Sequence, residues 1–134
     1  MMKAIAVLLS LALLASGAQA QTAKEQHELS ALCGKQAAER FEKSWGKQED
    51  ELNHYESHYN SRLNKCFYVE WTNSLKDAFP FFSSILYDLN ENKEYGSYAM
   101  WMKFPEKPLH CRVQMKSCES QDEWAELIKP FMED

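Results

Sequence analysis

The sequence predicts an α+β domain in which helices flank an antiparallel sheet. Near both ends of the chain, apolar residues recur every three or four positions, as in amphipathic helices. In the middle they recur at every second position, as in strands. Short polar or proline-containing segments separate the alternating stretches. We therefore expect N-terminal helices, an antiparallel meander of about four strands, and a C-terminal helix packed on the sheet, with the helices on one face.

The first twenty residues are typical of an export signal. Lys3 supplies a short positive region, residues 4–15 are almost wholly apolar, and the run Ala-Gln-Ala at 18–20 offers small residues to a signal peptidase. The apolar run is shorter than the about 20 residues that span a bilayer. We expect cleavage before Gln21, which leaves residues 21–134 as a single disulfide-stabilised domain without a membrane span. The form of the signal favours a bacterial protein that is periplasmic or secreted.

The expected mature chain is acidic. Removing Lys3 from 15 basic residues leaves 14 against 20 acidic ones, a net charge of −6 with histidine neutral. Proteins that bind nucleic-acid phosphates usually carry the opposite sign, so no nucleic-acid partner is expected. The charge would instead steer the protein toward a basic protein or another envelope component.

Residues 22–43 are expected to form the first helix. The stretch contains no proline, and Gly46 follows it as a stop signal. Its apolar residues recur at steps of three and four. They are Leu29, Leu32, Cys33, Ala37, Phe41 and Trp45.

A second, shorter helix is expected over residues 49–60, where Leu52, Tyr55 and Tyr59 would share one side. His54 and His58 would then stand at i and i+4 and project together.

The pattern changes to period two after the second helix. Residues 67–72 alternate between apolar and polar. Residues 85–89 and 98–104 flank the polar run 90–93 like the arms of a hairpin, and residues 109–115 alternate again. These stretches give the meander of about four strands. An aromatic and methionine cluster within them is interpreted as sheet core, with an apolar ligand pocket as the alternative: Tyr95, Tyr98, Met100 and Trp101.

A closing helix follows Ser120. The segment from Ser120 to Glu123 matches a capping box, in which the hydroxyl and the carboxylate satisfy backbone N–H groups. The apolar stripe behind it should lie on the sheet, and Pro130 should kink or shorten the last turn. The stripe consists of Trp124, Leu127, Ile128 and Phe131.

Four cysteines remain after the signal, an even number for an oxidising compartment. We favour pairing Cys33 with Cys66 and Cys111 with Cys118, because only six residues separate the last two and a tight hairpin would bring them together. If Phe67 faces the core, Cys66 points the other way, so its bridge to the first helix requires it to precede the strand. A structural zinc site is the alternative, but it usually needs two close pairs.

Several chemistries lack the residues they need. The mature chain has only Gly34, Gly46 and Gly96, so neither a phosphate-binding P-loop, a dinucleotide-binding turn nor a hydrolase nucleophile elbow can be assembled. With every cysteine paired, no thiol is left as a nucleophile. We expect no catalytic residue and no cofactor.

The histidine pair is the sharpest chemical candidate. On one helix face, His54 and His58 could share a metal, but a zincin helix needs glutamate directly after the first histidine, and Tyr55 holds that position. We favour two surface histidines beside buried tyrosines and expect no metal. His54, His58 and Tyr59 are kept as candidate binding residues.

Two strings carry a resemblance. The segment 58–66, HYNSRLNKC, and the ending 123–132, EWAELIKPFM, resemble a group of small exported bacterial proteins without an assigned activity. The likeness covers roughly residues 33–132. It implies an exported protein with the four-cysteine frame and supplies no catalytic residue. Family members often have a glycine-containing turn between the last two cysteines, and residues 112–117 contain none.

These observations predict a non-enzymatic exported module that binds a protein, an envelope component or a small ligand. Inhibition of a basic cell-wall enzyme is one concrete version. A small metal-dependent hydrolase using His54 and His58 is the alternative from another class, and a purely structural envelope protein is a third. The sequence leaves the partner and the oligomeric state open.

Overall fold

The computed structural model describes residues 21–47 and 52–134. The expected export signal and residues 49–51 of the predicted second helix lie outside the described residues. The described elements are α1 (Ala23–Trp45), β1 (Asn53–Asn60), β2 (Lys65–Lys76), β3 (Phe79–Asp88), β4 (Lys93–Trp101), β5 (His110–Val113), β6 (Lys116–Ser117) and α2 (Gln121–Met132).

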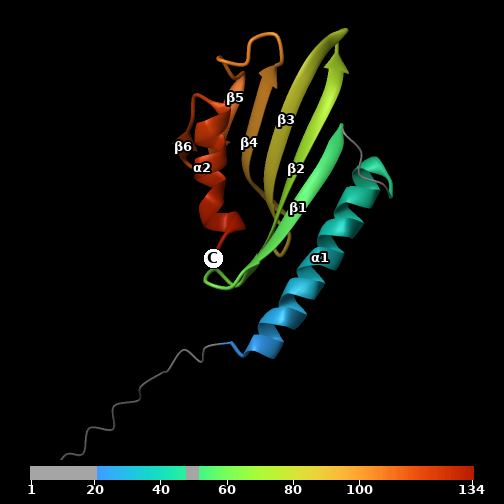
Figure 1. Cartoon of the computed structure of the whole chain (residues 1–134), viewed down its shortest axis with the longest axis vertical. Helices are drawn as coiled ribbons and strands as arrows, with labels where there is room; N and C mark the ends of the chain where they lie inside the picture. Colours follow the sequence, from blue (N-terminus) through green and yellow to red (C-terminus); the bar gives the residue numbers. More distant parts are fainter. Residues whose placement is uncertain (1–20, 48–51) are drawn as a thin grey trace, which may run out of the picture.

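All six described strands form one antiparallel sheet in the order β1-β2-β3-β4-β5-β6 (Figure 1). Each strand pairs with the next along the chain. The α+β class and the meander are therefore present, with six strands in place of about four. The described helices are not long and apolar enough to cross a membrane.

The two helices lie on opposite faces of the sheet, so the expectation of a single helical face is wrong. Neighbouring residues of β2 show the division. Tyr68 packs with Ala37 and Phe41 of α1, whereas Phe67 packs in the cluster that contains Trp124 of α2. Because successive strand side chains point to opposite faces, the two helices are separated by the sheet.

This arrangement removes the difficulty over Cys66. Cys66 lies inside β2, with its side chain on the face of Tyr68, and forms a disulfide with Cys33 of α1. It does not need to precede the strand, because α1 and α2 use different faces. The bridge joins the helix to the sheet at a small second cluster that also contains Tyr59.

The predicted helix over residues 49–60 is wrong, since residues 53–60 form β1. Tyr55 and Tyr59 are four residues apart, and this spacing is compatible with one helix face and also with one strand face. In the sheet Tyr55 contacts Phe41 and Tyr68 under α1, with ring centroids 4.8 and 5.4 Å away. A strand thus buries Tyr59 and half-buries Tyr55.

The main core lies between the sheet and α2. Ser120 caps this helix by accepting from the Glu123 N–H at 3.1 Å, as the capping box predicts. The Glu123 carboxylate accepts from the N–H of Glu119 rather than from that of Ser120. The predicted stripe packs on the sheet, and Pro130 lies inside the helix without ending it.

The second disulfide joins Cys111 to Cys118 across the β5–β6 hairpin, the pairing that the sequence favours. The turn contains no glycine. Gln114 instead takes the left-handed conformation there, with φ 52°.

Several predicted inward positions lie outside the sheet. β4 ends at Trp101, so Met102 and Phe104 follow the strand and are exposed. Leu109 and Met115 flank β5 and are exposed as well. Met102, Phe104 and Leu109 lie at one end of the sheet, which therefore carries apolar side chains that the main core does not use.

Candidate functional site

His54 and His58 do not form a shared metal site. Both lie on β1 and on one face, but four residues of a strand span about 13 Å. The His54 ring stacks on Trp71 of β2, and His58 Nε2 lies 3.5 Å from Asp134 Oδ1. Among the described residues, no group of histidine, cysteine and acidic side chains could hold a metal ion.

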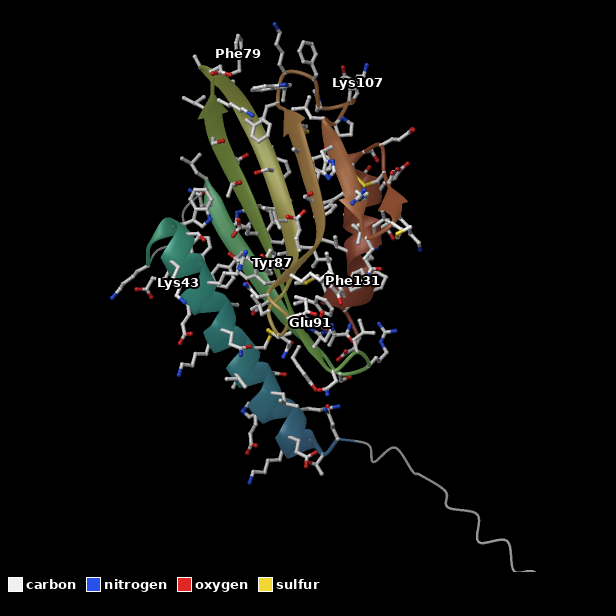
Figure 2. All side chains as sticks on the ribbon, turned by 180° about the vertical axis from the view of Figure 1, so that it is seen from behind. Lys43, Phe79, Tyr87, Glu91, Lys107 and Phe131 are labelled. Carbon is white, nitrogen blue, oxygen red and sulfur yellow. A yellow bond between two sulfur atoms is a disulfide. The ribbon has the colours of Figure 1, made fainter. Side chains whose placement is uncertain are left out.

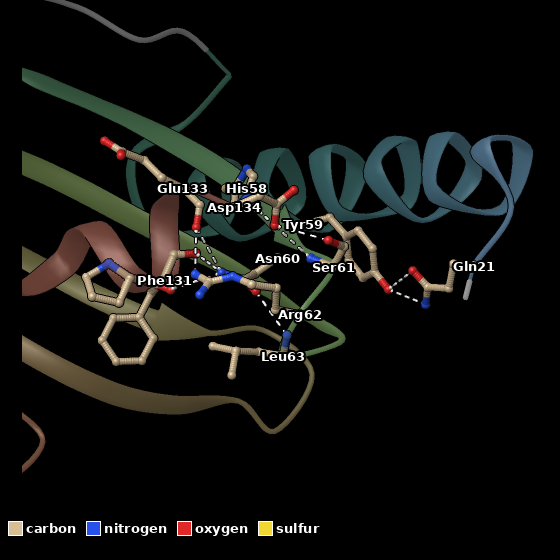
Figure 3. Close-up of polar contacts among 11 residues, drawn as sticks. Gln21, His58, Tyr59, Asn60, Ser61, Arg62, Leu63, Phe131, Glu133 and Asp134 are labelled. Carbon is tan, nitrogen blue, oxygen red and sulfur yellow. Dashed lines mark hydrogen bonds and ion pairs between the residues drawn. The ribbon is translucent and has the colours of Figure 1, made fainter. Parts of the chain in front are cut away.

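The third candidate, Tyr59, belongs to a polar network at the end of the sheet where β1 turns into β2 (Figure 3). We call this end the base, formed by residues 58–66 with the end of α2. The Tyr59 hydroxyl donates to Asn64 Oδ1 at 2.6 Å and accepts from Gln21 Nε2 at 2.8 Å. These bonds hold the start of the described chain against the turn, so the hydroxyl is already engaged.

Asn60 is the centre of the base, although the sequence analysis did not select it. Its side chain is completely buried, and Nδ2 donates to the carbonyl oxygens of Pro130, Phe131 and Glu133 at 3.0–3.3 Å. Its Oδ1 accepts from the Leu63 N–H at 3.0 Å. Asn60 therefore closes the β1–β2 turn and caps the last carbonyls of α2 at once.

Asp134 ties the end of the chain to the same turn. Its carboxylate accepts from the backbone N–H and the hydroxyl of Ser61. The Ser61 N–H is the main reason that the pKa of Asp134 lies below its ordinary value, and His58 adds to the effect.

Lys65 completes the base on the β2 side. Its ammonium group contacts Asp88, Glu91 and the Tyr95 hydroxyl at 2.6–3.0 Å. The hydrogen bond to the buried Asp88 carboxylate, followed by the bond to Glu91, raises the pKa of Lys65. The segments 58–66 and 123–132 thus meet at the base, where their polar groups hold the fold.

A second titratable cluster lies between α1 and the sheet. The Tyr68 hydroxyl donates to Glu70 at 2.6 Å, and the Arg40 guanidinium lies 3.5 Å from the centre of the Tyr87 ring. Burial, then the bond to Glu70, raises the pKa of Tyr68, so its phenol stays protonated. This cluster fastens α1 to the sheet.

A shallow groove of about 540 Å³ follows β4 and β5. Its lining mixes cationic and anionic side chains, Lys93, Arg112 and Glu94 among them. The mixture selects neither sign of ligand, and we assign no function to the groove.

The end of the sheet opposite the base is different. We call it the apolar tip, formed by residues 74–82, residues 101–109 and Leu52. Ten large apolar side chains are exposed among the described residues, and six of them lie at the tip. These six are Leu52, Leu75, Phe79, Met102, Phe104 and Leu109.

The tip is apolar on both faces of the sheet. On the face of α2, Leu75, Pro80 and Met102 line a hollow of about 440 Å³. On the face of α1, Phe79, Trp101 and Phe104 line another of about 380 Å³. Both hollows are lined by strand and loop residues, without a residue of either helix.

The tip is ordered by backbone and ring contacts. Met102 N–H donates to the Pro80 carbonyl at 3.0 Å, and Phe104 N–H donates to the Trp101 carbonyl at 2.9 Å. The Trp101 ring packs edge-on against Phe79 and Phe81. The exposed rings are thus presented on a fixed frame.

Comparisons with protein-family models, curated proteins and solved structures find no match. The candidate site therefore rests on geometry. The tip was not expected from the sequence, because Met102 and Phe104 were assigned to an alternating strand and residues 74–82 had no assigned role. Residues 79–82 did carry a signal. All four are apolar, and because successive residues of a strand point to opposite faces, they place apolar side chains on both faces of the sheet.

Proposed function

We propose that this chain is an exported, non-enzymatic binding module of the cell envelope that contacts its partner through the apolar tip. One observation carries the proposal, namely the gathering of six of the ten exposed large apolar side chains at one end of the sheet. Scattered exposed apolar residues need no explanation, but a contiguous patch is typical of an interaction surface.

The two disulfides support the exported part of the proposal, since they are typical of oxidising compartments. The mass of the protein recovered from its natural source tests export. We expect a chain that begins at Gln21 and is four hydrogens lighter than the reduced form, because two disulfides are present. An intact Met1 would contradict export.

A non-catalytic role is supported by the use of the polar side chains. The candidate histidines are too far apart to share a metal, and the polar groups of the base are bonded to one another. The alternative of a basic-enzyme inhibitor has only the acidic net charge in its favour, and the tip itself does not add to that charge.

Sedimentation with an isolated envelope fraction tests the binding function. The protein should sediment with the envelope, and the double variant L75S/F79S should stay in the supernatant. The matched control L63S/M115S makes the same kind of change at two exposed apolar residues outside the tip. Equal sedimentation of the two variants would overturn the proposal.

A further inference from the structure

We infer that the apolar tip docks on the surface of an anionic lipid bilayer, with its aromatic and aliphatic side chains at the interface and its lysines among the headgroups. The inference rests on the proposed function, because the tip is the contact surface in both. It adds the chemical nature of the partner.

The first support is the distribution of apolar side chains over both faces. A flat protein partner would cover one face of the sheet, whereas a bilayer surrounds an inserted edge on both. Leu75 points to the face of α2 and Phe79 to the face of α1, with exposed fractions of 74 and 55 %. An edge that enters the interface would bury both side chains together.

The second support is the combination of tryptophan, phenylalanine and lysine. Trp101 packs edge-on against the exposed ring of Phe79 and the half-buried ring of Phe81, and tryptophan is enriched at membrane interfaces. Lys76 and Lys103 extend along phenylalanine rings, with their ammonium groups 5.5 and 5.6 Å from the ring centres. Lysines in this arrangement reach the headgroups while their stems cover apolar surface.

The third support is the sign of the local charge. Residues 74–82 and 101–109 contain three lysines and two carboxylates, whereas the other described residues contain eleven basic and fifteen acidic side chains. The tip is therefore slightly positive on an otherwise acidic molecule. An anionic lipid surface would attract the tip and repel the rest, which orients the molecule tip first.

The shape of the molecule permits this approach. The β2–β3 hairpin projects beyond the ends of both helices (Figure 1). Phe79 and Lys107 both lie at this end, far from Glu91 and Phe131 near the base (Figure 2). Gln21 and Asp134 are bonded at the base, so neither end of the described chain obstructs the tip.

Binding to vesicles tests the inference. Vesicles of phosphatidylcholine mixed with phosphatidylglycerol should bind the processed protein, and pure phosphatidylcholine should bind it more weakly. L75S/F79S should lower the partition constant roughly ten-fold or more, because two apolar side chains no longer enter the interface. Each lysine-to-alanine change at the tip should lower it up to about five-fold, and added salt should weaken this part.

The control variant L63S/M115S should bind like the wild type. Bromine-labelled acyl chains should quench tryptophan fluorescence in the wild type and much less in Trp101→Phe. Near-ultraviolet circular dichroism of every variant shows that its fold is retained.

The outcomes separate this inference from the proposed function. If the envelope fraction retains the protein through the tip but no vesicle does, the inference is overturned and the partner is a protein. If neither binds it, both proposals fail. If L75S/F79S and L63S/M115S bind vesicles equally, or bromine does not quench Trp101, the tip does not enter the bilayer and the inference is again overturned.

Discussion

The base and the apolar tip lie at opposite ends of one sheet and use their side chains in opposite ways. At the base, the amide of Asn60 and the ammonium group of Lys65 are each bonded to several partners, and Asn60 is completely buried. At the tip, Leu75 and Phe79 are more than half exposed. The base should therefore determine stability and the tip should determine binding.

The two ends of the sheet separate residues that stabilise the fold from residues that are available to a partner, which the sequence alone does not distinguish. Residues 58–66 and the end of the segment 123–132 lie at the base, where contacts join the β1–β2 turn to α2. The two segments close the fold at this end of the sheet. The surface available to a partner lies elsewhere, and substitutions at the two ends should give separable effects on stability and binding.

The largest effect is expected from the disulfides. C33A/C66A should lower the free energy of unfolding by about 4 kcal/mol, because that bridge closes a separation of 33 residues in the unfolded chain. C111A/C118A, with a separation of 7, should cost about 2.5 kcal/mol. Urea denaturation of both variants gives the comparison. A smaller loss for C33A/C66A than for C111A/C118A would contradict the role given to the bridge between α1 and the sheet.

Asn60→Asp should have the next largest effect. Aspartate has the same shape but lacks the N–H donors, so the carbonyls of Pro130, Phe131 and Glu133 would face a carboxylate. We expect a loss of about 2–3 kcal/mol in urea denaturation. Asn92→Asp is the matched control. It keeps the oxygen that accepts from Arg40 on an exposed turn and should change stability little. Equal losses in the two variants would remove the central role of Asn60 at the base.

Much of the fold was predictable from local signals. The capping box at Ser120 and the stripe from Trp124 to Phe131 locate α2 and its buried face, and the separation of Cys111 and Cys118 indicates their hairpin. Residues 53–60 were not predictable in this way, because spacings of four residues fit both a helix and a strand. The contact of Tyr55 with α1 decides between them only in three dimensions.

The placement of the helices on opposite faces follows only when the disulfide pairing is combined with the alternation of strand side chains. Cys66 is tied to α1 and Phe67 to α2, and neighbours in a strand point to opposite faces, so this pair already implies that the sheet lies between the helices. The tip was missed for another reason. Strand alternation does not tell where the covering helices end, so Met102 and Phe104 fit the pattern of a core although no helix lies over them.

Ala78→Gly tests whether the turn at the tip is more strained than the turns near the base. The left-handed positions near the base include Asn64 and Asn92, a residue type that tolerates this conformation, whereas the two-residue β2–β3 turn at the tip places Asp77 and Ala78 there, with φ 50° and 66°. An alanine in this conformation destabilises the folded state by about 1–2 kcal/mol. Glycine removes this strain, but its more flexible unfolded chain offsets about 0.5–1 kcal/mol of the gain. We expect a net gain of about 0.5–1 kcal/mol in urea denaturation.

The control for this change is Ala99→Gly, inside β4, which should destabilise the protein because the strand does not need the added freedom. A78G should leave binding by the tip unchanged, since it removes no exposed apolar ring. A loss of stability in A78G would show that the turn is not strained.

The smallest effect concerns the pH dependence of the base. The pKa of Asp134 is lowered in the folded state, so its carboxylate contributes stability above its ordinary value of 3.8, and this contribution is lost as the pH falls through the lowered value. The side chain is half exposed, so the contribution is at most about 0.5 kcal/mol. Asp134→Asn should remove this acid-dependent part and leave a flatter profile of unfolding free energy below about pH 4. Asp77→Asn, at the tip, is the matched control, because it makes the same change and leaves Asp134 and its bonds to Ser61 in place. If the two variants have the same profile, the bonds from Ser61 and His58 do not stabilise the base, and the energetic contrast between the two ends rests on Asn60 and the disulfides alone.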